Sequence, residues 1–164
     1  MADKRERTGV IVSRSKIAWF VWTPEIGEGI IICNDDRLFL GQWIKFAAMI
    51  IENRQRHVNI GYYVADGWSV TPAVLNAKPR YNNLLLESKI YVSNWQMDKL
   101  EADWVGPVSD RYHAIEESTN FCGLQKTYTV VLKRVRKSDE CPVCEWVVTD
   151  LKVRGSVFSK YLEY

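Results

Sequence analysis

The stretch GVIVSRSKIAWFVWTPEIGEGIIICNDDRLFLGQWIKF, residues 9–46, decides the fold. In it, runs rich in valine, isoleucine, tryptophan and phenylalanine alternate with short segments that contain glycine, proline, asparagine or aspartate. This alternation is typical of β-strands joined by turns. The pattern continues along the rest of the chain, and no long segment has a helical period capped at both ends. We therefore predict a mainly β protein with short antiparallel strands.

The predicted strands fall into two groups of five, one in each half of the chain. In the first half they lie near residues 9–14, 16–23, 28–33, 42–51 and 58–65. In the second half they lie near residues 83–87, 89–96, 102–106, 125–135 and 145–153.

The two halves also resemble each other in sequence. Ser-Lys-Ile at 15–17, followed by Trp22, has the same internal spacing as Ser-Lys-Ile at 88–90, followed by Trp95. Later strands in both halves precede a polar, basic segment. A tandem repeat of one small β-unit explains this order.

A unit of five short strands hides its edges most economically by closing into a small barrel of the OB type. The stretch 9–46 resembles the strand-glycine-strand layout of cold-shock and S1-like OB-fold proteins. In particular, LGQWIKF at 40–46 is similar to the glycine-led entry into their fourth strand. The resemblance implies two tandem five-stranded OB-like, cold-shock-like barrels, with a short helical insertion in the second.

The predicted organisation divides the chain into two barrels, a linker and a tail. Pro72 and Pro79 mark the linker, and RYHAIEES is the best helical stretch of the insertion. The ranges are 8–70 for the first barrel, 71–80 for the linker, 81–156 for the second barrel, 109–124 for its insertion and 157–164 for the tail.

Composition limits the function classes. The 164 residues include 22 basic and 20 acidic side chains, so a global field cannot drive binding to nucleic acid or membrane. No run of about 18 apolar residues occurs, and the charged start MADKRERTG lacks the apolar region of a secretory signal. We expect a cytoplasmic or nuclear protein with no membrane partner.

Four aromatic side chains are predicted to point outward. Strand alternation places Ile17, Trp19 and Val21 on the face that we expect to form the barrel interior. The opposite face, with its counterpart in the second half, then carries Phe20, Trp22, Tyr91 and Trp95. These rings could pack between the barrels or beneath a loop, stack on bases, or line a groove for a protein partner.

Basic segments occur at matching places, after the fourth predicted strand of each half. NRQRH at 53–57 and KRVRK at 133–137 both contain Arg-x-Arg, and both are predicted to be turns. Guanidinium groups suit phosphates, although turns are often charged simply because they are exposed. The candidate nucleic-acid contacts are Arg54, Arg56, Lys133, Arg134, Arg136 and Lys137.

The segment CPVC gives Cys141 and Cys144 the spacing that lets two thiolates bind one zinc ion. A complete site needs further ligands, for which Cys122, His113 and Cys33 are candidates, although Cys33 is most simply a small core residue. No second Cys-x-x-Cys is present, so we expect unliganded cysteines and no cofactor, with structural zinc as the alternative.

Nothing in the sequence indicates catalysis. His57 and His113 lack the setting of a nucleophile or metalloprotease motif, and GEG at 27–29 lacks that of a nucleotide-binding loop. We therefore expect no enzyme and no small-molecule substrate. The leading hypothesis is a non-catalytic adaptor that binds a protein partner by a sheet edge or an aromatic groove, within an RNA-processing or small-RNA assembly that the resemblance suggests.

Two alternatives stay open. One is direct binding of single-stranded RNA or DNA by the outward aromatics and basic turns. The other is a Tudor-like reader, whose aromatic cage binds methylated side chains.

Overall fold

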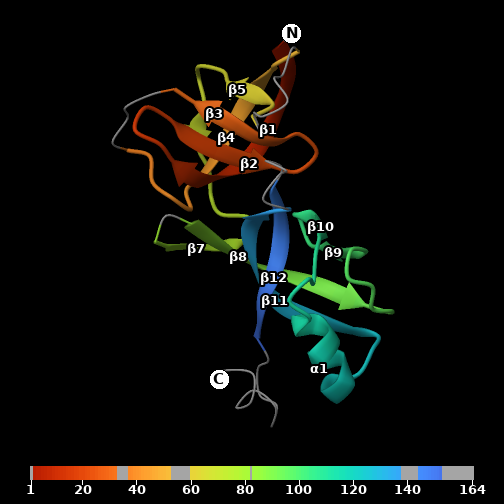
Figure 1. Cartoon of the computed structure of the whole chain (residues 1–164). Helices are drawn as coiled ribbons and strands as arrows, with labels where there is room; N and C mark the ends of the chain where they lie inside the picture. Colours follow the sequence, from red (N-terminus) through yellow and green to blue (C-terminus); the bar gives the residue numbers. More distant parts are fainter. Residues whose placement is uncertain (1, 33–36, 53–59, 82, 138–143, 153–164) are drawn as a thin grey trace. The chain divides into compact units, whose positions relative to one another are not determined.

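The computed structural model describes residues 2–32, 37–52, 60–81, 83–137 and 144–152. The regular structure of these residues consists of β-strands and one short helix (Figure 1). This confirms the prediction of a mainly β protein. They divide into two compact units. The first comprises Met1–Leu84 and Arg136–Val143, and the second comprises Leu85–Val135 and Cys144–Tyr164.

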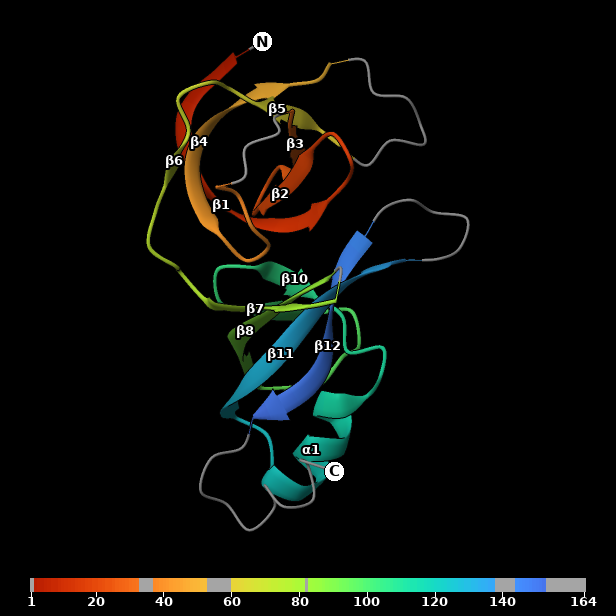
Figure 2. The same cartoon turned by 90° about the vertical axis from the view of Figure 1, so that its left-hand side faces the viewer.

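The first unit contains a closed five-stranded barrel, seen in Figure 2. β1 pairs with both β2 and β4, β2 pairs with β3, and β5 joins β3 to β4, so no edge is left open. All these pairs are antiparallel except β3 with β5, which is parallel. A short further strand, β6, pairs with β4. The bounds are β1 Ala2–Arg14, β2 Trp19–Thr23, β3 Gly27–Ile31, β4 Trp43–Ile50, β5 Tyr62–Val64 and β6 Ser69–Val70.

The barrel interior follows from strand alternation. Trp19 and Val21 point inward from β2, as predicted, and Ile17 instead lies in the turn before β2 with its side chain 69% exposed. The phenol of Tyr62 crosses the core, stacks on Phe46 with ring centroids 5.7 Å apart, and donates to the Gly27 carbonyl at 3.0 Å. The core cluster consists of Ile11, Trp19, Val21, Ile31, Leu38, Ile44, Phe46, Ala48 and Tyr62.

The sheet of the second unit is curled rather than fully closed. Its strand order is β10-β9-β8-β11-β12, and β7, whose residues belong to the first unit, also pairs with β8. After β10, Ser109 forms a parallel bridge with Val147 of β12, and its N–H donates to the Trp146 carbonyl at 2.9 Å. The bounds are β7 Asn76–Arg80, β8 Asn83–Val92, β9 Leu100–Ala102, β10 Gly106–Val108, β11 Lys126–Arg136 and β12 Cys144–Lys152.

A single helix, α1 (Ala114–Cys122), lies within the predicted helical insertion, between β10 and β11. Its first turn is fixed by Asp110, which is fully buried. The Asp110 carboxylate accepts hydrogen bonds from the backbone N–H groups of Ile115 and Glu116 at 3.0–3.1 Å. This satisfies two of the donors that a helix N-terminus leaves without partners.

Two turns share one backbone conformation. β2 and β3 are joined by Pro24–Ile26, and β9 and β10 by Asp103–Val105, so both connections are three residues long. Glu25 and Gly27 have φ of 74° and 71°, and Trp104 and Gly106 have 66° and 87°. The structural correspondence between the two units is therefore clearest at these turns.

The predicted alignment of the two Ser-Lys-Ile motifs is wrong. Ser15 belongs to the turn between β1 and β2, where its hydroxyl accepts from Ala18 N–H at 3.2 Å, whereas Ser88 lies inside β8. The strand pairings instead match β8 with β1. β1 pairs with β2 and β4, and β8 pairs in the same way with β9 and β11. The shared Ser-Lys-Ile sequence therefore belongs to a turn in the first unit and to the interior of β8 in the second.

Two predicted connections and one predicted strand also differ from the structure. Residues 76–80 of the predicted linker form β7, and KRVRK continues β11 to Arg136 instead of forming a turn. The predicted strand 102–106 is centred on the turn between β9 and β10. Within the described ranges, no helix has the length and apolar composition needed to cross a membrane.

Candidate binding surface

A row of apolar side chains crosses the outer face of the barrel. In the strand registers, Phe20 of β2 lies opposite Ile30 of β3, Ile30 opposite Tyr63 of β5, and Tyr63 opposite Met49 of β4. Side chains of directly opposed residues point to the same side of a sheet. We call these four residues the outer stripe.

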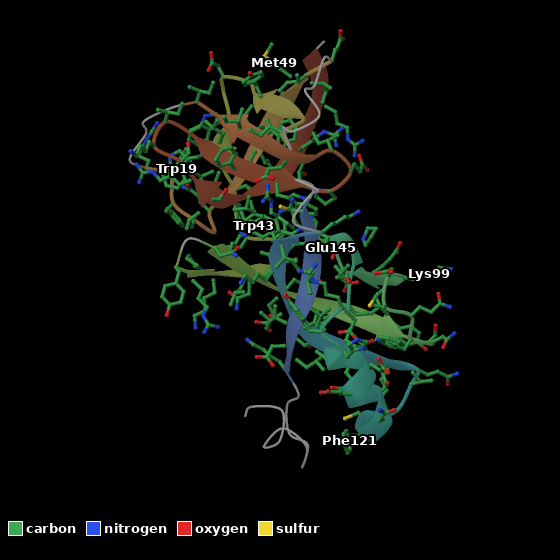
Figure 3. All side chains as sticks on the ribbon, in the orientation of Figure 1. Trp19, Trp43, Met49, Lys99, Phe121 and Glu145 are labelled. Atoms are coloured by element: carbon green, nitrogen blue, oxygen red, sulfur yellow. The ribbon has the colours of Figure 1, made fainter. Side chains whose placement is uncertain are left out.

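The outer stripe is partly open to solvent. Tyr63 is 46% exposed and Met49 is 49% exposed, and Phe20 and Ile30 are half-buried. Figure 3 shows Met49 at the outside of the first unit. Ile32, just after β3, adds a 66% exposed apolar side chain. Large exposed apolar patches mark interaction sites on protein surfaces, which makes the outer stripe a candidate binding surface.

The inward neighbours of the outer stripe hold it in place. Trp19, Ile31, Ala48 and Tyr62 precede or follow stripe residues on their strands, and all four are in the core cluster. Successive side chains of a strand point to opposite faces. A shift of the strand register by one residue would therefore bring the stripe residues into the core and expose their buried neighbours. The outer stripe is therefore set rigidly by the core beneath it.

The four predicted aromatics have different environments. Phe20 belongs to the outer stripe. Trp22, although it also points away from the core cluster, is only 7% exposed and lies in a row with Val10 and Trp43. Tyr91, on β8, is 60% exposed.

Trp95 has a structural contact in the second unit. Its indole N–H donates to Asp110 Oδ2 at 2.8 Å, so it supports the same carboxylate that begins α1. Its ring also lies near that of His113, with centroids 5.8 Å apart. The structure therefore assigns Trp95 a role at the start of α1.

The basic candidates are only partly described. Arg54 and Arg56 lie outside the described residues. In β11, Lys133 lies opposite Leu85, and the Arg134 guanidinium stacks on the Trp146 ring at 5.4 Å. Arg136 and Lys137 are exposed at the end of that strand.

The zinc candidates are separated along the elements of the second unit. Cys144 is the first residue of β12, Cys122 is the last of α1, and Cys141 lies outside the described residues. Among the described residues, no three His, Cys, Asp or Glu side chains are placed to hold one metal ion.

His113, the remaining zinc candidate, precedes α1 and already has a partner. Its Nδ1 lies 2.6 Å from Glu116 Oε2, and this hydrogen bond raises the pKa of His113 above the ordinary 6.5. The interaction supports the first helical turn.

The comparisons give no relative for this chain. It matches no protein-family model, and it shows no significant similarity to a curated protein or to a solved structure. Function must therefore be inferred from the molecule itself.

Sequence reasoning missed Ile30, Tyr63 and Met49. Alternation alone places each on an outer face, but only the strand registers show that they form one row with Phe20. The signal that was available is the pair Tyr62-Tyr63, in which one ring must point outward if the other fills the core.

Proposed function

We propose that the chain is a non-catalytic adaptor of two OB-like modules that binds a protein partner through the outer stripe. The observation that carries this proposal is the continuous row of Phe20, Ile30, Tyr63 and Met49 across four strands of one barrel. A fixed, partly exposed apolar row with aromatic members has the composition of the centre of a protein interface.

The strand order supports the OB-like part of the proposal. The order β1-β2-β3-β5-β4, closed by β1 with β4 and with β3 parallel to β5, gives a five-stranded barrel of the kind expected for an OB-like module. In the second unit, β8 to β12 follow the same order, and the Ser109–Val147 bridge supplies the corresponding parallel contact. OB modules bind ligands on the face of their second and third strands, where Phe20 and Ile30 lie.

A protein partner suits the chemistry of the outer stripe better than RNA does. Ile30 and Met49 offer no planar surface for a base, but they fill apolar pockets well, and methionine adapts to irregular partners. Aromatic rings contribute large contact area at low entropic cost. We propose that the adaptor acts within an RNA-processing or small-RNA assembly, in the cytoplasm or nucleus, and needs no cofactor.

The test compares two double variants in cells and in solution. Met49→Lys with Tyr63→Lys charges the outer stripe, and Val70→Lys with Val74→Lys adds the same charge at exposed apolar positions of the same unit. Partners that co-purify with the wild type and with the control, but not with the stripe variant, are then purified and titrated calorimetrically. We expect direct binding that is insensitive to salt and lost only in the stripe variant. Equal binding by both variants would refute the proposal.

Direct binding of single-stranded RNA or DNA is the second candidate function. It is favoured by Tyr91, which is 60% exposed on β8 and follows exposed Lys89 by two residues on the same face. This function predicts affinity that falls steeply with salt. Arg136→Ala with Lys137→Ala tests it at two exposed positions at the end of β11.

A Tudor-like reader is the third candidate and remains a prediction. It requires several rings around one methylated side chain, and binding of a methylated over an unmethylated peptide would test it.

A further inference from the structure

The hairpin formed by β7 and the start of β8 has an unusual tip. Tyr81, which follows β7, has φ of 56° and is 94% exposed. A bulky residue rarely adopts this left-handed conformation, and backbone outliers of this kind concentrate at functional sites. Figure 1 shows the hairpin labelled at β7 and β8.

The hairpin carries two cations that have no acidic partner among the described residues. Lys78 and Arg80 are both exposed, and neither they nor Tyr81 makes an ion pair or ring contact with the described part of the chain. By contrast, Arg7, Arg111 and Lys152 all have carboxylate partners. The sequence contains no aspartate or glutamate between Asp66 and Glu87.

The opposite side of β7 is anchored within the first unit. Ala77 and Pro79 alternate with Lys78 and Arg80, and they lie beside Gly41. A β-carbon placed on Gly41 would be 3.7 Å from Ala77 Cβ and 3.6 Å from Pro79 Cγ. One face of the strand therefore lies against Gly41, although Pro79 stays exposed, and alternation points Lys78 and Arg80 to the opposite face.

We propose that Lys78, Arg80 and Tyr81 form a contact site for single-stranded RNA. The exposed phenol offers a stacking surface for one base, and the two cations, which are two residues apart on one face, contact neighbouring phosphates. Pro79 cannot donate to an added strand, which disfavours strand addition by a protein at this edge. The site is separate from the outer stripe, so the adaptor would contact RNA and a protein by different surfaces.

The variants separate the chemistry of the site from the stability of the hairpin. Tyr81→Gly removes the ring but suits a positive φ, so the hairpin keeps its turn. Tyr81→Phe keeps the stacking surface. Lys78→Gln with Arg80→Gln removes two charges, and Lys99→Gln with Lys126→Gln removes two charges from exposed positions of the second unit.

The measurement is fluorescence anisotropy of labelled oligouridine with the full chain, at several salt concentrations. We expect Tyr81→Gly to weaken binding about 5- to 100-fold, as loss of one base stack does, and Tyr81→Phe to bind like the wild type. The hairpin double variant should lower the salt slope by about 1.4, the contribution of two phosphates on a single strand. The control double variant should leave the slope unchanged. With 4-thiouridine in the oligonucleotide, the photocrosslink should map to Tyr81.

Three outcomes would overturn this proposal. They are no binding of oligouridine at low salt, equal affinity of Tyr81→Gly and wild type, and the same loss in the control double variant. Binding of an acidic peptide instead of oligouridine, with the same dependence on the hairpin, would identify a protein ligand and also overturn it. The outer-stripe variants should bind oligouridine normally, so failure of one proposal does not imply failure of the other.

Discussion

The ring of Tyr62 occupies the space where a side chain of Gly29 would lie. A β-carbon built on Gly29 would overlap three ring atoms of Tyr62. The two residues are paired in the parallel contact between β3 and β5, the contact that closes the barrel. The glycine is therefore required by packing, because only a bare backbone lets the phenol reach the carbonyl groups of Val21 and Gly27.

Replacing Gly29 by alanine should destabilise the first unit strongly. The added methyl group must displace the Tyr62 ring or separate β3 from β5, and overpacking of this kind costs about 1–3 kcal/mol or more. Urea unfolding followed by tryptophan fluorescence measures the loss. In a Tyr62→Leu background the same substitution should cost less, since the obstructing ring is gone.

Gly67→Ala is the control for this prediction. Gly67 has a positive φ of 93° but open space around it, so alanine there introduces backbone strain without a clash. If Gly29→Ala costs no more than Gly67→Ala, the packing explanation is wrong.

Much of the fold could be predicted because burial alternates along the strands. The five-stranded first half and the helix within 109–124 were predicted from local patterns, and β4 and β11 were placed to within about two residues, the usual uncertainty of strand ends. In the second half the predicted number of five arose from two errors that cancelled. β8 was divided at Ser88, and β9 and β10 were merged.

Both errors have a physical cause. The predicted strands 83–87 and 89–96 stop and start on either side of Ser88, a polar residue. In the structure Ser88 is only 3% exposed, and β8 continues through it because its hydroxyl donates to the Asp103 carbonyl at 2.8 Å. The turn after β9 was hidden because Trp104 and Val105 are typical strand residues, yet Trp104 has a positive φ. The Val105-Gly106 pair, which matches Ile26-Gly27, was the signal that would have shown the turn.

The candidate site was less predictable than the fold. Alternation placed Phe20 outward, but joining it to Met49 requires the register of four strands, including a parallel pair whose paired residues are 33 residues apart. Such long-range pairing leaves no local pattern in a sequence. The contact of Trp95 was equally hard to predict, because β9 and β10 separate it in the sequence from its partner Asp110.

The buried carboxylate of Asp110 predicts a stability effect at Trp95. Trp95→Phe should cost about 1.5–3 kcal/mol, since it removes a hydrogen bond to a charged group that stays buried. Amide exchange at Ile115 and Glu116 should accelerate in the same variant. In an Asp110→Asn background the cost should shrink, because the indole no longer bonds to a charged group.

An unchanged stability of Trp95→Phe would contradict this role for the indole. Trp68→Phe provides a reference for the loss of indole area in the other unit, where Trp68 packs against the core cluster.

The pair His113–Glu116 predicts a pH dependence of helix α1. Because the hydrogen bond to Glu116 raises the pKa of His113, protonated His113 is favoured in the folded state. The stabilisation is fully present below the unfolded pKa of 6.5 and is lost as the pH rises through the folded pKa. The effect is small, since both side chains are exposed and screened.

NMR titration of the His113 ring tests this directly. Glu116→Gln should return the pKa of His113 toward 6.5, whereas Glu117→Gln, which removes the smallest of the contributions that raise this pKa, should shift it less. Equal shifts in the two variants would show that the hydrogen bond is not the main cause.

The adjacent outward residues of β2 should respond very differently to truncation. Trp22 is 7% exposed and packed in a row with Val10 and Trp43, so Trp22→Ala should cost about 3–5 kcal/mol, as large core truncations do. Phe20 is half-buried in the outer stripe, so Phe20→Ala should cost about 1 kcal/mol.

Urea unfolding of both variants measures the difference, and binding to the partner of the outer stripe gives the complementary readout. Phe20→Ala should lose that binding while it keeps the fold, because a half-buried aromatic ring on the outer face contributes mainly to the interface. A Phe20→Ala variant that unfolds as readily as Trp22→Ala would mean that Phe20 belongs to the core, and the outer stripe would lose its first member.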